Sequence, residues 1–119
     1  MRPERLYLQD IVDAAEAVTR FVEERSEEQF LNDEILMSAV LHKLTVIGEA
    51  ASRMPKELRE THPEVPWGEI IGFRNFLVHA YFAIEWSIIW TTAKHDVPEL
   101  KAAIKKIRAL LPLEDESQE

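Results

Sequence analysis

No cysteine occurs among the 119 residues, and this absence excludes several kinds of site at once. Disulfide bonds, thiolate zinc sites and cysteine nucleophiles all need a thiol that the chain does not have. Long apolar runs are missing as well, because no stretch approaches the ~18 apolar residues of a membrane span. The first ten residues include charged side chains and no apolar run. From these absences we expect a cytoplasmic protein with no membrane partner.

Glycine and proline are scarce, at three and six residues, whereas alanine, leucine and glutamate are abundant. Alternating β-branched runs, the usual sign of strands, are missing. This composition favours helices throughout. A chain of this length can bury enough surface for one core, so we expect a single all-α domain over residues 1–113. Residues 114–119 are acidic, and we expect them to be disordered.

Positive charge is in short supply, because 14 lysines and arginines face 22 acidic residues and the formal net charge is −8. This balance argues against unspecific binding of nucleic acid, which depends on neutralising phosphates with Lys and Arg. A nucleic-acid site should therefore be local and lie in the more basic second half. Five bases flank the last apolar stripe: Lys94, Lys101, Lys105, Lys106 and Arg108. They could guide RNA, although charges beside a buried stripe usually form a solvated face.

Apolar residues recur at spacings of three and four along four long segments, which is typical of amphipathic helices. The predicted helices run from Pro3 to about Arg25, from Asn32 or Asp33 to about Pro55, from Trp67 to about Phe82, and from Ile84 to Leu111. A proline-rich connector, residues 54–66, holds one short helical turn. Pro98 interrupts the last helix without breaking its stripe, so we expect a kink or two nearly coaxial helices, the second capped by Asp96. The result is a small antiparallel bundle of four to five helices.

The stretch RNFLVHAY, residues 74–81, places polar groups on an otherwise apolar helix. On a helical wheel Arg74 falls in the middle of the apolar face, where a guanidinium needs a partner. We predict that Glu49, in the preceding helix, is that partner. Asn75 and His79 are one turn apart and share a second face. Tyr81 lies along the same line as Arg74.

A helix that is apolar on nearly all sides must be covered on all sides, and dimerisation is the simplest way to cover it. His79 of one chain could then approach Arg74 of the other. From the residues alone, purely structural roles carry more weight. His79 would be a hydrogen-bonded core residue, Arg74 would belong to a structural ion pair, and Tyr81 would be an interface residue. The remaining histidines have no zinc-site spacing, and we expect surface or capping roles for them: His42, His62 and His95.

Four segments together resemble the HepT-type toxins of the HEPN superfamily. They are VIGEAASRMP (46–55), PEVPW (63–67), EIIGFRNFLVHAYF (69–82) and IIWTTAKHDVPELKAAI (88–104). The resemblance extends over nearly the whole chain, to about Leu111. It implies a small helical bundle that forms a homodimer, with an Arg-x4-His-x-Tyr motif at the dimer cleft.

The resemblance also implies an activity and a partner. The protein would be a metal-independent, cofactor-free endoribonuclease, the toxin of a type VII-like toxin–antitoxin pair. A MntA-like minimal nucleotidyltransferase would be the antitoxin. By position, Arg74 and His79 would be catalytic, Asn75 would be a supporting polar residue, and Tyr81 would be the residue to which the antitoxin adds AMP.

The residue types suit metal-free cleavage of RNA. An imidazole such as His79 can exchange a proton near neutral pH. A guanidinium such as Arg74 stays charged and can stabilise a phosphorane. AMP on Tyr81 would add bulk and a negative charge beside that cation. Two alternatives stay open: a non-catalytic HEPN subunit that binds nucleotide or substrate for a partner nucleotidyltransferase, and a purely structural dimerisation module.

Overall fold

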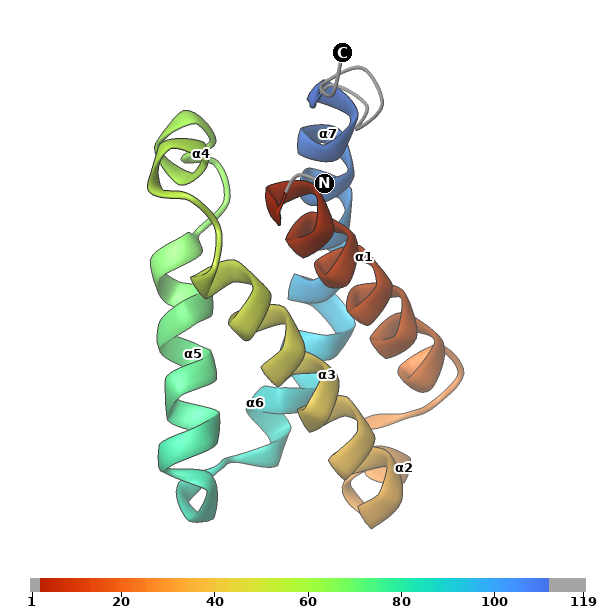
Figure 1. The fold of residues 1–119 in the computed structure, drawn as a ribbon. Helices are drawn as coiled ribbons and strands as arrows, with labels where there is room; N and C mark the ends of the chain where they lie inside the picture. Colours follow the sequence, from red (N-terminus) through yellow and green to blue (C-terminus); the bar gives the residue numbers. More distant parts are fainter. Residues whose placement is uncertain (1–2, 112–119) are drawn as a thin grey trace.

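The computed structural model describes residues 3–111, which fold into helices joined by short connections (Figure 1). The long helices are α1 (Pro3–Val22), α3 (Glu34–Ser52), α5 (Trp67–His79) and α7 (Val97–Leu110). The shorter elements are α2 (Glu27–Leu31), α4 (Lys56–Thr61), the 3-10 turn η1 (Tyr81–Ala83), α6 (Trp86–Thr91) and the π-helical turn η2 (Thr92–Asp96). No strand occurs between residues 3 and 111, which confirms the all-α prediction. The tail predicted to be disordered, residues 114–119, lies outside the described residues.

The long helices pack around α1 and α3. Helix α1 packs against α3 and α7, and α5 packs against the other side of α3 (Figure 1). The fully buried large side chains of the described chain come from the other helices and not from α5; they include Leu8, Ile11, Phe30, Val40, Ile89 and Ile104. In α5 only Trp67 and Leu77 are buried. Helix α5 is therefore an edge helix of the single chain, covered mainly on the side that faces α3.

Helix α3 forms as its sequence pattern predicts. Asp33 is its N-cap and accepts a hydrogen bond from the backbone N–H of Leu36 at 3.0 Å. Its predicted apolar stripe is buried in full: Leu36, Val40, Leu44, Ile47 and Ala51. Contrary to the expectation that no stretch is long and apolar enough to cross a membrane, α3 is, within residues 3–111, the one helix that meets this description, with a mean hydropathy of 1.3. A buried core helix passes the same test, and the packing of α3 between α1 and α5 accounts for its apolar character.

The segment between α1 and α3 is more helical than predicted. Helix α1 ends at Val22 rather than near Arg25, and the stretch expected to be a break contains α2. Ser26 and Gln29 form a capping box at the start of α2, in which each side chain accepts from the other residue's backbone N–H. Helix α2 then buries Phe30 with its ring centroid 5.4 Å from that of Trp90. Five residues are too few to show an apolar period, so the stripe analysis misses this helix.

Helix α5 is shorter than predicted, because it ends at His79 and not near Phe82. The chain then turns through η1 toward α6. In this turn Tyr81 packs edge-on against Trp86, with ring centroids 6.5 Å apart and an interplanar angle of 87°. Such an edge-to-face contact is favourable and stabilises the turn that ends the helix.

Pro98 is accommodated by a π-helical turn and not by a helix break. Proline has no N–H, and its ring crowds the carbonyl four residues earlier, so the wider turn η2 relieves both problems. Asp96 directly precedes α7, as predicted, but the prediction that its side chain caps a new helix is wrong. Its backbone is helical and its side chain makes no capping hydrogen bond, because the π turn carries the helix through this position.

Candidate active site

Helices α3 and α5 approach each other closely where they meet, and Gly48 makes this approach possible. A Cβ atom added at Gly48 would lie 2.1 Å from Cβ and 2.7 Å from Cγ of Arg74. Any larger residue would push Arg74 and its helix away from α3. Because it has no side chain, Gly48 leaves the space on α3 that the side chain of Arg74 occupies. The sequence pattern does not reveal this role.

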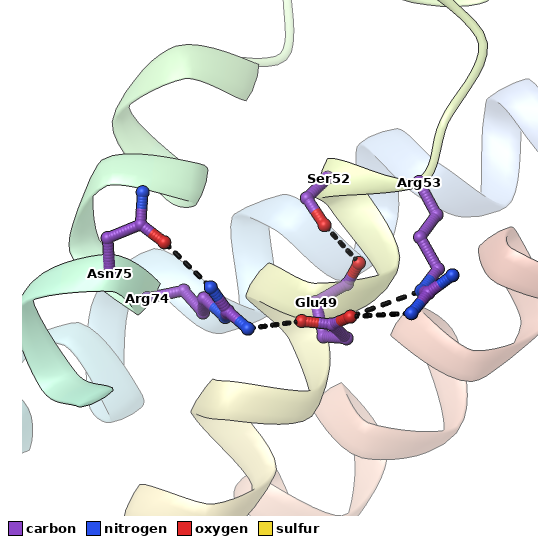
Figure 2. Close-up of polar contacts among 5 residues, drawn as sticks. All are labelled: Glu49, Ser52, Arg53, Arg74 and Asn75. Atoms are coloured by element: carbon purple, nitrogen blue, oxygen red, sulfur yellow. Dashed lines mark hydrogen bonds and ion pairs between the residues drawn. The ribbon is translucent and has the colours of Figure 1, made fainter. Parts of the chain in front are cut away.

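Two side chains hold the guanidinium of Arg74 at this crossing (Figure 2). Its Nη2 donates to Oε1 of Glu49 at 2.6 Å, and its Nη1 donates to Oδ1 of Asn75 at 2.7 Å. The second carboxylate oxygen of Glu49 accepts from Nε and Nη2 of Arg53, at 3.1 and 3.0 Å. The ion pair predicted between Arg74 and Glu49 is present, and Arg53 extends it.

Arg74 keeps donors for a further ligand. Its side chain is 27% exposed, and each terminal nitrogen uses one N–H in the bonds to Glu49 and Asn75. The second N–H of each nitrogen is left for an incoming group, and a planar guanidinium matches two oxygens of a phosphate. The protein thus orients this cation while leaving part of it open to an anion.

His79 and Tyr81 lie beyond the Arg74 cluster, at the end of α5 and in η1. The His79 side chain is exposed and makes no hydrogen bond or ion pair with any residue from 3 to 111. Tyr81 is 54% exposed, with one ring edge against Trp86. Asn75 is a candidate to orient His79, but its side-chain oxygen is bonded to Arg74. The structure brings Glu49, Arg74 and Asn75 together and leaves the imidazole and the phenol accessible.

A single chain does not bring Arg74 and His79 to one point. Both lie on α5, and five residues of α-helix separate them by about 7.5 Å along the axis and about 140° around it. Their side chains therefore leave the helix on different faces.

The other histidines form no metal site. In the described range, no group of three or more His, Cys, Asp or Glu side chains is placed to hold a metal ion. His62 is the C-cap of α4, and its ring lies 3.3 Å from a carboxylate oxygen of Glu64. His42 and His95 are exposed. These positions agree with the surface and capping roles expected from the sequence.

Three of the bases beside the last stripe are engaged in packing. Lys94 donates to the carbonyl oxygen of the last residue of α1 at 2.8 Å. Arg108 donates to the side-chain oxygen of Gln9 at 2.9 Å, and Lys105 pairs with Glu16 at 3.4 Å. All three contacts join α1 to η2 or α7, so these cations tie the bundle together rather than form a free basic surface.

Comparison with known proteins identifies the family. The family model described as "Ribonuclease HepT-like" matches residues 11–107, which is most of the chain. The chain belongs to the HepT-like ribonuclease family. This membership confirms the resemblance to HepT-type proteins of the HEPN superfamily that the motifs around Glu49 and Arg74 indicate.

Individual relatives align over nearly their full length. A protein of Thermococcus cleftensis named "Probable ribonuclease HepT" is 39% identical over 107 residues, covering 90% of this chain and 97% of the relative. A protein of Caldanaerobacter subterraneus subsp. tengcongensis, named as a candidate RNase, is 41% identical over 107 residues, covering 90% and 96%. A Methanocaldococcus jannaschii protein, also named as a candidate RNase, is 36% identical over 103 residues, covering 87% and 89%. No solved structure matches the chain.

Proposed function

We propose that this HepT-like protein is a metal-independent endoribonuclease in which Arg74 and His79 act on the phosphodiester. One observation carries the proposal. The guanidinium of Arg74 is oriented by Glu49 and Asn75 at a helix crossing and still presents free N–H groups. The exposed imidazole of His79 lies on the same helix. The family and the names of the relatives support RNA as the substrate class.

The reaction needs one proton removed and one proton supplied. A base takes the proton of the 2′-hydroxyl, whose oxygen attacks the adjacent phosphorus, and the bond from phosphorus to the 5′-oxygen breaks. An acid gives a proton to that leaving oxygen, so the products are a 2′,3′-cyclic phosphate and a 5′-hydroxyl. An imidazole such as that of His79 can serve in either step. The two free N–H groups of Arg74 stabilise the extra negative charge on the phosphorane.

The proposed active unit is a homodimer with α5 at its interface. Beside the exposed His79, the end of α5 and the η1 turn present four large apolar or aromatic side chains to solvent in the single chain: Phe76, Val78, Tyr81 and Phe82. Exposed apolar patches of this kind mark interaction sites. A second copy packed around this end of α5 and η1 would cover these side chains. It would also place His79 of one chain near Arg74 of the other. The angle of about 140° between these two side chains on one helix would then no longer keep them apart.

Control of the enzyme is proposed to act through Tyr81. Its hydroxyl-bearing ring is 54% exposed in the single chain and follows His79 by two residues, so a modifying enzyme can reach it before a second copy covers this end of α5. Addition of AMP by a MntA-like nucleotidyltransferase would place a negative phosphodiester beside the catalytic groups and block access of RNA. In this proposal the protein is a cytoplasmic toxin and the nucleotidyltransferase is its antitoxin.

The test of the nuclease is cleavage of total RNA in excess EDTA by protein expressed without a nucleotidyltransferase. We expect wild type to cut and leave 2′,3′-cyclic phosphate ends, and His79→Ala to lose roughly 10²–10⁴-fold in rate. Arg74→Lys keeps the charge but loses the planar fork and should also fail. The matched control is His42→Ala, which removes an exposed histidine from α3 and should cut normally. Equal cutting by all folded variants, or none by wild type, would favour the non-catalytic binding subunit.

The composite dimer site has a separate test by complementation. Arg74→Lys and His79→Ala proteins, each inactive, are mixed and allowed to exchange subunits. A mixed dimer has one site with both substitutions and one site with neither, so the mixture should regain roughly a quarter of the wild-type rate. If Arg74 and His79 act within one chain, every site in the mixture carries a substitution and no activity returns.

A further inference from the structure

The polar contacts at Arg74 do not stop at Glu49. They form a row that crosses α3 from α5 toward α1, in the order Asn75, Arg74, Glu49 and Arg53 (Figure 2). The Arg53 side chain is 58% exposed and donates from Nε and Nη2, and its Nη1 makes no hydrogen bond or ion pair with residues 3–111. The row contains two guanidinium groups and one carboxylate, and therefore has a net positive charge in a chain that is acidic as a whole.

A hollow of about 290 Å³ opens between α1 and α3 at the Arg53 end of this row. Its apolar walls are the ring of Tyr7, which also packs on the core, and the side chains of Val46 and Ala50. Asp10 lines the hollow with a carboxylate that makes no hydrogen bond or ion pair to any described residue. Glu49 and Arg53 line it as well, so the hollow and the Arg74 cluster share a residue.

This combination of surfaces matches one nucleotide of an RNA chain. An aromatic ring beside aliphatic side chains provides a face on which a nucleobase can stack. A free carboxylate accepts hydrogen bonds from an exocyclic amino group, as acidic side chains do with cytosine. A guanidinium at the mouth binds the phosphate of the same nucleotide. The negative charge of Asp10 keeps phosphate out of the hollow itself, so the base and not the backbone enters it.

We propose that the hollow lined by Tyr7, Asp10 and Arg53 is a nucleobase subsite beside the scissile phosphate, and that it selects a base with an amino group. Cytosine, adenine and guanine carry such a group. Uracil has no amino group, and the one donor on its pairing edge, the N3–H, lies between two carbonyl oxygens that the Asp10 carboxylate repels, so uracil is disfavoured. This inference rests on the proposed ribonuclease function, because Arg74, at the other end of the same row, is the group assigned to the reacting phosphate. It adds a source of sequence preference that the catalytic groups do not supply.

The first experiment measures binding without cleavage. Fluorescent RNA oligomers with 2′-O-methyl groups, identical except for C or U at one position, are titrated with the protein and followed by anisotropy. Wild type should bind the C oligomer roughly tenfold more tightly than the U oligomer. Tyr7→Leu should weaken both by roughly tenfold or more, since base stacking on an aromatic ring is lost. Asp10→Asn should abolish the preference for C while circular dichroism shows an unchanged fold.

The matched control is Asp13→Asn, which makes the same change of charge on the exposed side of the same helix but outside the hollow. It should keep the preference for C. If wild type has no base preference, or if Asp10→Asn and Asp13→Asn behave alike, the subsite is wrong.

Cleavage assays separate the two proposals. RNA cut by wild type without base preference, and cut equally by Tyr7→Leu, would overturn the subsite and leave the nuclease standing. A wild type that neither binds the oligomers nor cuts RNA would overturn both.

Discussion

The close approach of α3 and α5 makes a specific prediction for Gly48→Ala. The new Cβ would lie 2.1 Å from Cβ of Arg74, about 1.3 Å short of the 3.4 Å at which ordinary van der Waals contact begins. The neighbouring atoms belong to the start of a side chain and the backbone behind it, which cannot rotate away. The two helices must therefore separate by roughly 1 Å.

Two opposing terms decide the effect on stability. Alanine in a helix interior is favoured over glycine by about 0.8–1.0 kcal/mol. Overpacking costs about 1–3 kcal/mol, and a separation of 1 Å or more stretches the 2.6 Å bond between Arg74 and Glu49 beyond hydrogen-bond range. Loss of that bond removes about 1 kcal/mol more. We expect a net loss of about 1–3 kcal/mol and a Tm lower by roughly 4–12 °C.

The assay is thermal and urea unfolding of three single variants that make the same change. Gly68 and Gly72 lie on α5, and a Cβ at either position would meet nothing within 4 Å. Alanine at these two controls should therefore leave stability unchanged or raise it by up to about 1 kcal/mol. A Gly48→Ala protein as stable as wild type would refute the close approach. In RNA cleavage, a misplacement of Arg74 by about 1 Å should cost up to 10²-fold in rate for the same variant.

Three further substitutions test other parts of the structure. Asp33→Ala removes the N-cap bond to Leu36 and should lower stability by about 1 kcal/mol in urea unfolding; an unchanged midpoint would count against the cap. Lys94→Met removes the 2.8 Å hydrogen bond to the carbonyl oxygen of Val22 and the cation that lies over the Trp90 ring. The Tm should therefore fall by a few degrees. An unchanged Tm would mean that water replaces these contacts fully. Phe82→Ser replaces a side chain that is 91% exposed and should not reduce monomer stability, but it should weaken self-association in sedimentation velocity; identical sedimentation of both proteins would argue against an interface at η1.

Apolar periodicity predicts the long helices because each must bury one stripe in a shared core. The stripe of α3 and its Asp33 cap are found as predicted. Apolar periodicity does not predict structural elements that depend on only a few residues. Helix α2 depends on a capping box and on one buried side chain, Phe30, and the π turn before Pro98 is a backbone adjustment with no periodic signal.

In the candidate site, too, some contacts could be predicted from the sequence and others could not. The pairing of Arg74 with Glu49 could be predicted, because a guanidinium on an apolar face demands a carboxylate and Glu49 is in the neighbouring helix. The role of Gly48 could not, since it depends on where two helix axes cross. The contact of Asn75 with Arg74 rather than with His79 also depends on that crossing, which turns the guanidinium toward α3 and brings one edge within 2.7 Å of the amide oxygen.

The overall acidity of the chain bears on how the proposed enzyme would choose its substrate. With a formal net charge of −8, the protein has little long-range attraction for RNA, and three of the bases beside α7 are already bonded to α1. Binding energy must then come from short-range contacts, and the row from Arg74 to Arg53 supplies two guanidinium groups within one small region. Few phosphates are neutralised in such a site, so affinity for RNA should depend only weakly on salt. Weak unspecific binding also gives base contacts a larger share of recognition, because they are not masked by attraction to the backbone at every other position.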